Sequence, residues 1–177
     1  LDSLPPFPDK PEVLGILRPL IVEGSRISAE QQAKLSRIGF SFIGDRVIDW
    51  INDPQGFTTP EKPYATWVLT SDKTTSDVQS ARRKLTPIQR GGNVFEAIAF
   101  LNAFSDIARD GLFNLPGSQV RRFYRFPPDY ILKEFPEKYV YLSTQGFGLN
   151  TADLRKYGED GLSCNTLISF RGINLSD

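Results

Sequence analysis

The feature that most constrains the fold of this chain is the segment NVFEAIAFLNAFSDIAR at residues 93–109. At 100° per residue, about half of the helical circumference carries apolar side chains and is broken only by Ser105. These apolar residues are Val94, Ala97, Ile98, Phe100, Leu101, Phe104, Ile107 and Ala108. The pattern predicts an amphipathic helix with a wide apolar face, which has to be buried against another layer of the fold.

Both ends of this helix are specified locally. Asn93 has a side chain suited to an N-cap, and Glu96 stands three residues later, which is the spacing of a capping box. Gly111 offers the left-handed residue that commonly ends a helix. We therefore expect a helix between positions 93 and 110, with Glu96 on its polar side.

Four further segments favour β-strands, because β-branched and aromatic residues dominate them and turn residues flank them. They are residues 64–70, 120–126, 139–143 and 167–170. The face of Trp67 is expected to lie toward the core, and Pro116, Gly117 and Ser118 predict a turn. Short helices are predicted at residues 12–22, 28–38, 45–51, 76–85 and 152–157.

These elements predict a single α+β domain. A small, mostly antiparallel sheet would carry the central helix on one face, and short helices from the N-terminal third would close the core. The prolines at positions 5, 6, 8 and 11 predict a proline-rich N-terminal arm at residues 1–11, followed by one globular domain at residues 12–177.

Composition narrows the classes of function. The 177 residues contain no histidine, which excludes Ser/His/Asp catalysis and histidine-ligated metals within this chain, and we expect no metal site and no cofactor. Balanced counts of 21 basic and 21 acidic residues give no overall field for nucleic acid. No apolar run approaches the ~20 residues of a membrane span, so we expect no membrane partner. The cytoplasm is the default location, with a removed N-terminal signal as the alternative.

The most unusual surface candidate is the segment VRRFYRF at residues 120–126. Aromatic and arginine residues are enriched at interfaces, so we expect a non-catalytic module that binds a protein partner or small ligand. The binding residues would be Arg121, Arg122, Tyr124 and Arg125. The same pattern would also suit single-stranded nucleic acid, an alternative that the neutral chain disfavours. The ordinary reading is a sheet strand with aromatic anchors inside and arginine heads in solvent.

A catalytic alternative uses the only cysteine, Cys164, as a candidate nucleophile. Without histidine, its thiolate would need activation by a nearby cation or a helix N-terminus, and a lone cysteine is more often a small buried apolar residue. Paired carboxylates such as Glu159 and Asp160 offer acid/base chemistry for the same hydrolase or transferase class.

Several short motifs occur in a fixed order between residues 38 and 171. They are Pro63-Tyr64 before a strand, Leu85-Thr86 before an alanine-rich helix, Pro116-Gly117-Ser118 after it, and Ser163-Cys164 followed by Arg171. This order resembles a family of small uncharacterised bacterial proteins, a domain of unknown function. Residues 89–92 depart from the acidic residue expected after the Leu-Thr pair. The resemblance implies only a compact mixed fold and assigns no functional residue.

Overall fold

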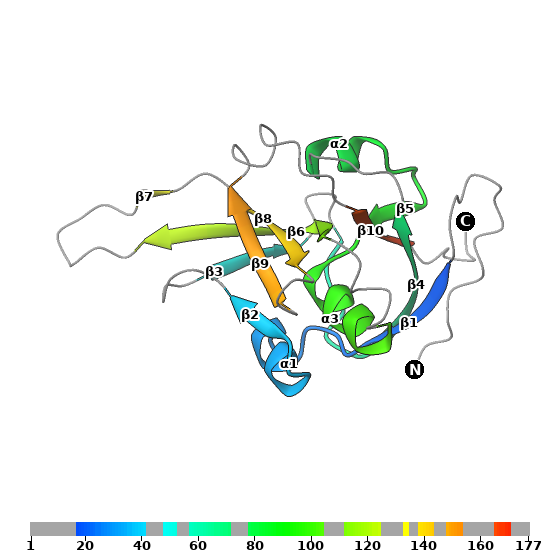
Figure 1. Ribbon diagram of the computed structural model, residues 1–177, viewed down its shortest axis with the longest axis horizontal. Helices are drawn as coiled ribbons and strands as arrows, with labels where there is room; N and C mark the ends of the chain where they lie inside the picture. The colour runs from blue at the N-terminus through cyan, green and yellow to red at the C-terminus, as the bar shows by residue number, and fades with distance from the viewer. Residues whose placement is uncertain are drawn as a thin grey trace.

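The computed structural model describes residues 17–41, 48–52, 57–71, 78–104, 112–124, 133–134, 138–143, 148–153 and 165–170. Within these residues the chain forms three helices and ten strands (Figure 1). The helices are α1 (Ala29–Leu35), α2 (Val78–Arg83) and α3 (Val94–Ala103). The strands are β1 (Arg18–Val22), β2 (Gly39–Ser41), β3 (Ile48–Asn52), β4 (Tyr64–Ser71), β5 (Gln89–Gly91), β6 (Leu112–Tyr124), β7 (Lys133–Glu134), β8 (Lys138–Ser143), β9 (Gly148–Asp153) and β10 (Asn165–Phe170).

The strands of the described residues form one sheet with the order β1-β4-β10-β6-β8-β9-β2. β3 and β7 pair with β6, and β5 pairs with β10. The β10–β6 and β2–β9 pairs are parallel, and the other strand pairs are antiparallel. The predicted α+β class with a mostly antiparallel sheet is therefore confirmed, although the sheet has more strands than the small one expected.

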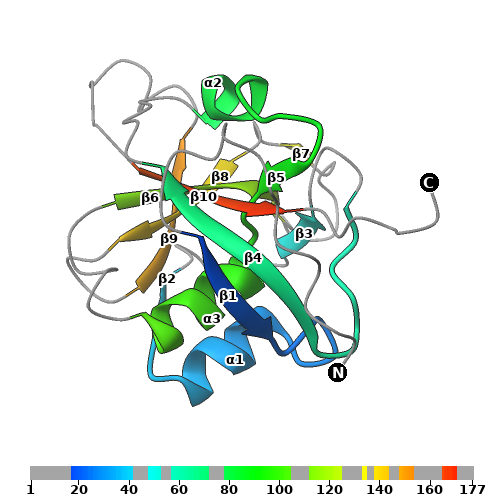
Figure 2. The ribbon, with the colours of Figure 1, turned by 90° about the vertical axis from the view of Figure 1, so that its right-hand side faces the viewer.

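Helix α3 forms the centre of the core. It contacts β1, β6 and α1, and Figure 2 shows α1 and α3 beside one another at the end of the sheet opposite α2. The buried residues of α3 pack with apolar side chains of β1, β4, β6 and β10, namely Leu20, Val22, Val68, Phe113, Leu115 and Leu167. The predicted central helix is confirmed over residues 94–103, and residues 105–110 lie outside the described part.

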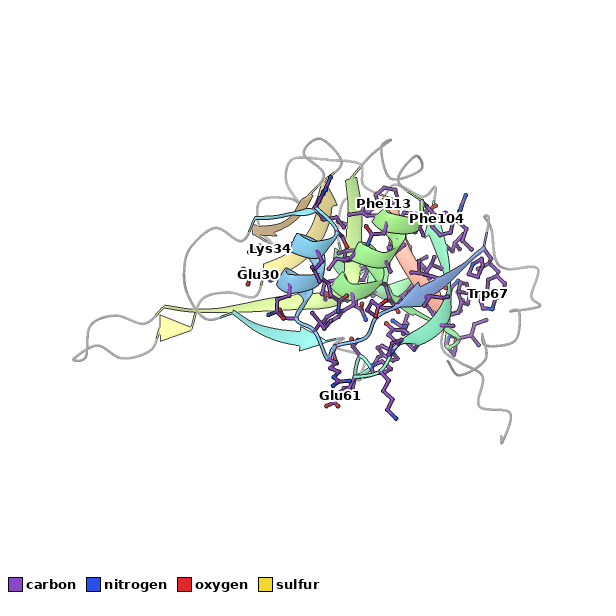
Figure 3. The ribbon with its side chains drawn as sticks, turned by 90° about the horizontal axis from the view of Figure 1, so that it is seen from below. Glu30, Lys34, Glu61, Trp67, Phe104 and Phe113 are labelled. Carbon is purple, nitrogen blue, oxygen red and sulfur yellow. The ribbon has the colours of Figure 1, made fainter. Side chains whose placement is uncertain are left out.

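Aromatic packing joins α3 to β6. The ring centroid of Phe100 lies 5.5 Å from that of Phe104 and 6.1 Å from that of Phe113, distances at which tilted ring pairs attract one another. Figure 3 shows Phe104 and Phe113 near the same end of α3. The apolar stripe of α3 is thus fixed to the sheet at its C-terminal end by ring contacts.

Strand β4 confirms the most regular strand prediction but reverses its faces. Val68 is fully buried in the cluster around α3 and Thr66 is buried beside it, whereas Trp67 is only half-buried. Figure 3 shows Trp67 on the outside of the sheet, away from α3. The prediction for Trp67 was wrong because Val68, on the other face, enters the cluster around α3; on the face of Trp67 it is Leu69 that is buried.

Residues 18–22 form strand β1 instead of the predicted helix. Leu20 and Val22 are buried and alternate with exposed Pro19 and Ile21, which is the period of a strand. Proline inside a helix removes a hydrogen bond and clashes with the preceding turn, so Pro19 is better accommodated in this strand, which ends the described sheet order. Residues 12–16 lie outside the described part, as does the predicted arm.

Two other predicted helices are also strands where they are described. Residues 48–52 form β3 beside β6, and residues 148–153 form β9 between β8 and β2. Both segments are short, so pairing with an existing strand outweighs their weak helical pattern. By contrast, α1 and α2 confirm the helices predicted around residues 28–38 and 76–85.

The turn predicted at Pro116, Gly117 and Ser118 is a bulge inside the long strand β6. Leu115 pairs with Val140 and Gln119 with Tyr139, so residues 116–118 have no counterparts on β8. A bulge accommodates Pro116, which cannot donate a ladder hydrogen bond. Gly117 has to be glycine, because a Cβ there would collide with the carbonyl of Gly91.

Helix α1 ends in a left-handed residue that is not glycine. The amide of Ile38 donates to the carbonyl of Ala33 at 2.8 Å and that of Arg37 to Lys34 at 3.1 Å, while Arg37 has a φ of 55°. Glycine normally takes this position, because a side chain in the left-handed region costs about 1–2 kcal/mol. Helix α1 thus ends at Leu35 with Arg37 in the left-handed position, and Gly39 already belongs to β2.

None of the described helices is long and apolar enough to cross a bilayer.

Replacing Arg37 by glycine is expected to stabilise the protein. The variant Arg37→Gly removes the Cβ strain at positive φ, while the greater freedom of glycine in the unfolded chain offsets part of the gain. We expect the free energy of unfolding to rise by about 0.5–1 kcal/mol, measured by urea denaturation. The control Lys34→Gly, inside α1, should lower it by about 1 kcal/mol. A loss in Arg37→Gly as large as in this control would contradict the assignment.

Candidate binding site

The predicted binding residues lie at the outer end of β6. Arg121, Arg122 and Tyr124 are the last residues of this strand, whereas Arg125 and Cys164 lie outside the described residues. Figures 1 and 3 both show this end of β6 extending past α1 and α3, with β3 and β7 beside it. Three of the four predicted residues thus lie on the part of β6 that extends beyond the helices.

Neighbouring strands pair with this segment, and both of its edges are paired as far as Val120. Val120 pairs with Trp50 of β3 and with Lys138 of β8, and Tyr124 pairs with Lys133 of β7. A strand whose two edges are already hydrogen-bonded cannot accept an added strand from a ligand. An added strand is therefore excluded at Val120, where both edges are paired, whereas among the described residues Arg122 pairs only with Ile48 and Tyr124 only with Lys133.

The bulge decides which face each residue of this segment belongs to. Leu115 pairs with Val140, and Val120 pairs with Lys138. Val140 and Lys138 are two residues apart in β8 and therefore belong to the same face of the sheet. Val120, Arg122 and Tyr124 therefore share the face of Leu115, the face on which α3 packs. Arg121 belongs to the opposite face. The strand register thus assigns Arg122 and Tyr124 to one face of β6 and Arg121 to the other.

A second candidate is a buried polar cluster at the start of α3, which we call the Glu96 cluster. Its members are Tyr64, Arg90, Asn93, Glu96 and Ser169. Arg90 binds both carboxylate oxygens of Glu96, with Nη1 3.0 Å from Oε2 and Nη2 in contact with Oε1. The hydroxyls of Tyr64 and Ser169 donate to the same carboxylate at 3.1 and 2.7 Å.

Local sequence builds the helical part of this cluster. The side chain of Asn93 accepts the amide of Glu96 at 2.9 Å, and the Glu96 carboxylate accepts the amide of Asn93 at 3.0 Å. The predicted capping box is therefore confirmed. Glu96 itself is fully buried, although the helical pattern assigns it to the polar side of α3. Its burial is tolerated because Arg90 supplies the opposite charge.

The electrostatics of the cluster favour a fixed ion pair. Burial lowers the pKa of Arg90, but attraction and hydrogen bonding to Glu96 outweigh burial, so the pKa lies above its ordinary value. Burial, followed by the negative charge of Glu96, raises the pKa of Tyr64 well above its usual range. The guanidinium carbon of Arg90 lies 3.7 Å from the ring centroid of Phe57, a cation–π contact that further stabilises the charge.

The arrangement leaves this cluster little chemical capacity. Both oxygens of Glu96 accept from several donors, so the carboxylate is poorly placed to take a proton from a substrate. Among the described residues, no group of three or more acidic or cysteine side chains is placed to hold a metal ion. We therefore interpret the Glu96 cluster as a structural connection between α3, β4, β5 and β10.

The glycine pair before α3 serves close packing and not phosphate binding. The amide of Gly92 donates to Leu167 at 2.7 Å, that of Val94 to the Ser118 hydroxyl at 2.8 Å, and that of Asn93 to Glu96. These amides are thus unavailable to an anion at this helix N-terminus. A Cβ at Gly91 would collide with Pro116 and Gly117, so β5 can approach the β6 bulge only with glycine there.

Sequence reasoning missed the role of Arg90. The only local signal for this cluster was the capping box, which indicated that the side chain of Glu96 turns back toward Asn93. The other partners are 32 and 73 residues from Glu96, at Tyr64 and Ser169, so sequence spacing alone could not reveal them.

No family model, curated protein or solved structure matches this chain. The resemblance to a family of small uncharacterised bacterial proteins therefore stays a prediction.

Removing the charge of Glu96 is expected to destabilise the protein strongly. Glu96→Gln leaves Arg90 as an uncompensated buried cation, so we expect a loss of about 3–5 kcal/mol in the free energy of unfolding. The double variant Arg90→Met with Glu96→Gln should cost less than the sum of the two single variants, because it removes both charges. Urea denaturation of the four proteins gives this comparison. A loss of unfolding free energy in the double variant equal to the sum of the two single losses would contradict the coupling between Arg90 and Glu96.

The raised pKa of Tyr64 predicts a stability loss at alkaline pH. The folded state keeps the phenol proton at pH values where the unfolded chain, with a pKa of about 10, releases it. The contribution of Tyr64 to the free energy of unfolding is thus fully present below about pH 10, and above that pH it falls by about 1.4 kcal/mol per pH unit.

The variant Tyr64→Phe isolates this effect. At neutral pH it should cost about 1–3 kcal/mol, because the hydrogen bond to the Glu96 carboxylate is lost. Between about pH 10 and 11 its unfolding free energy should fall less steeply than that of the native protein. Parallel curves for the two proteins in that range would show that Tyr64 has an ordinary pKa.

Proposed function

We propose that this chain is a non-catalytic binding module that engages a protein partner or small ligand through the outer part of β6. The observation that carries the proposal is the position of Arg122 and Tyr124. Strand register places them on one face of a strand that extends past the helices (Figure 1), where Arg122 pairs with β3 and Tyr124 with β7. Arginine and tyrosine at such a position are the residue types that most often dominate binding energy.

The chemistry of the core supports a role other than catalysis. The chain has no histidine, and the buried carboxylate of Glu96 is engaged by Arg90, Tyr64 and Ser169. This network has the character of a stabilised ion pair and lacks the accessible base that acid/base catalysis needs. A cytoplasmic location and kinship with the bacterial family remain part of the proposal.

The catalytic alternative rests on Cys164 and is separable by its thiol chemistry. A nucleophilic cysteine at neutral pH needs a lowered pKa, which makes it react much faster with a thiol reagent than a model peptide does. Reactivity equal to that of the peptide would remove the cysteine form of this alternative.

Truncation of Arg122 or of Tyr124 is expected to weaken peptide binding strongly. Peptides selected from a displayed random library against the native protein should lose at least about tenfold in affinity for Arg122→Ala and for Tyr124→Ala. Fluorescence anisotropy with the selected, labelled peptides measures the affinities. The melting temperature should stay nearly unchanged, because these residues lie beyond the core around α3.

Arg83→Ala is the matched control for this experiment. Arg83 is an exposed arginine on α2, which lies away from the outer end of β6 (Figure 1), so its loss should leave peptide affinity unchanged. Unfolding of Arg122→Ala or Tyr124→Ala would instead assign these residues to the core. Undiminished peptide binding by both folded variants would refute the proposed site.

A further inference from the structure

Strand pairing assembles a larger surface around Arg122 and Tyr124 than β6 alone provides. Directly paired positions of antiparallel strands lie on the same face of a sheet. The register of β3, β7 and β8 with β6 therefore adds residues that are distant in sequence to the face of Arg122, which we call the Arg122 face. The added residues are Ile48, Trp50, Lys133 and Lys138.

The same register places a different set on the opposite face. The pairs of Arg121 with Asp49 and of Phe123 with Glu134 belong there. Lys133 and Glu134 are neighbours in β7, yet strand alternation assigns them to opposite faces. The ribbon formed by β3, outer β6, β7 and the start of β8 therefore has two faces of different character.

The charges are sorted between these faces. The Arg122 face carries the basic residues Arg122, Lys133 and Lys138 and one acidic residue, Asp153, which pairs with Lys138. The opposite face carries Asp49 and Glu134 against the single cation of Arg121. A basic excess on one face selects a negatively charged partner, because complementary potentials favour association and disfavour wrong partners.

Strand register also assigns two aromatic residues to the Arg122 face. Trp50 pairs with Val120, and Tyr124 lies four residues further along β6. At ~3.3 Å per residue these positions are about 13 Å apart along the strand, a distance that an extended peptide covers with about four residues. A short extended segment therefore spans both aromatic positions of a face that also carries the three basic residues.

We infer that the partner is a protein with an acidic segment, and that this segment binds in extended form to the Arg122 face. This inference rests on the proposed function. Tryptophan, tyrosine and arginine are the residues that most often carry protein–protein binding energy. Nucleic acid is disfavoured because its binding depends on many phosphate contacts, whereas this chain has equal numbers of basic and acidic residues.

The test compares two adjacent charge reversals on opposite faces. A displayed random-peptide library is selected against the native protein at about 0.15 M salt, where charges more than ~8 Å apart in solvent are screened. Selected peptides should be enriched in aspartate and glutamate. By anisotropy they should bind Lys133→Glu about tenfold more weakly, which corresponds to about 1.4 kcal/mol. They should bind the control Glu134→Lys within about threefold of the native protein.

The outcomes separate this inference from the proposed function. Selected peptides that need Arg122 and Tyr124 but show no acidic enrichment, or that bind Lys133→Glu as well as the native protein, overturn the acidic partner and leave the binding site standing. Peptides indifferent to Arg122 and Tyr124 overturn both. A labelled 15-nucleotide oligothymidine that binds more tightly than the selected peptides, with affinity falling steeply with salt, replaces the acidic segment by nucleic acid.

Discussion

The structure depends on one buried ion pair, between Arg90 of β5 and Glu96 of α3. Glu96 is fully buried, so its charge would be very costly without the guanidinium and the hydroxyls of Tyr64 and Ser169. These partners belong to three different strands and the carboxylate to the central helix. A buried pair of this kind adds little net stability compared with apolar packing, but every arrangement that separates its members is penalised. We propose that it sets the position of α3 on the sheet.

The same region determines which side chains the outer sheet presents. The glycine at position 91 lets β5 approach the β6 bulge, and Ser118 within the bulge accepts the first amide of α3. The bulge inserts residues without counterparts on β8 and thereby assigns Arg122 and Tyr124 to the α3-side face. A contact made for packing the core thus fixes the composition of a surface farther along the strand, where the proposed recognition takes place.

Local signals predicted much of the fold but little of its pairing. The capping box of Asn93 was readable because its groups lie within three residues. The strand around Pro19 was mistaken for a helix because a short apolar run fits both periods, and the proline was the better guide. The burial of Glu96 and the grouping of Trp50 with Lys133 depend on pairings between distant segments and on a bulge. Such long-range registers are not encoded by local periodicity.

Native-state hydrogen exchange at the start of α3 tests the central role of the ion pair most directly. The amides of Asn93 and Glu96 donate within the cluster and should exchange only when the whole domain unfolds. Their exchange free energies should then equal the global free energy of unfolding and fall with denaturant at the same slope. Exchange through a local opening, with a much smaller free energy and little dependence on denaturant, would contradict the account.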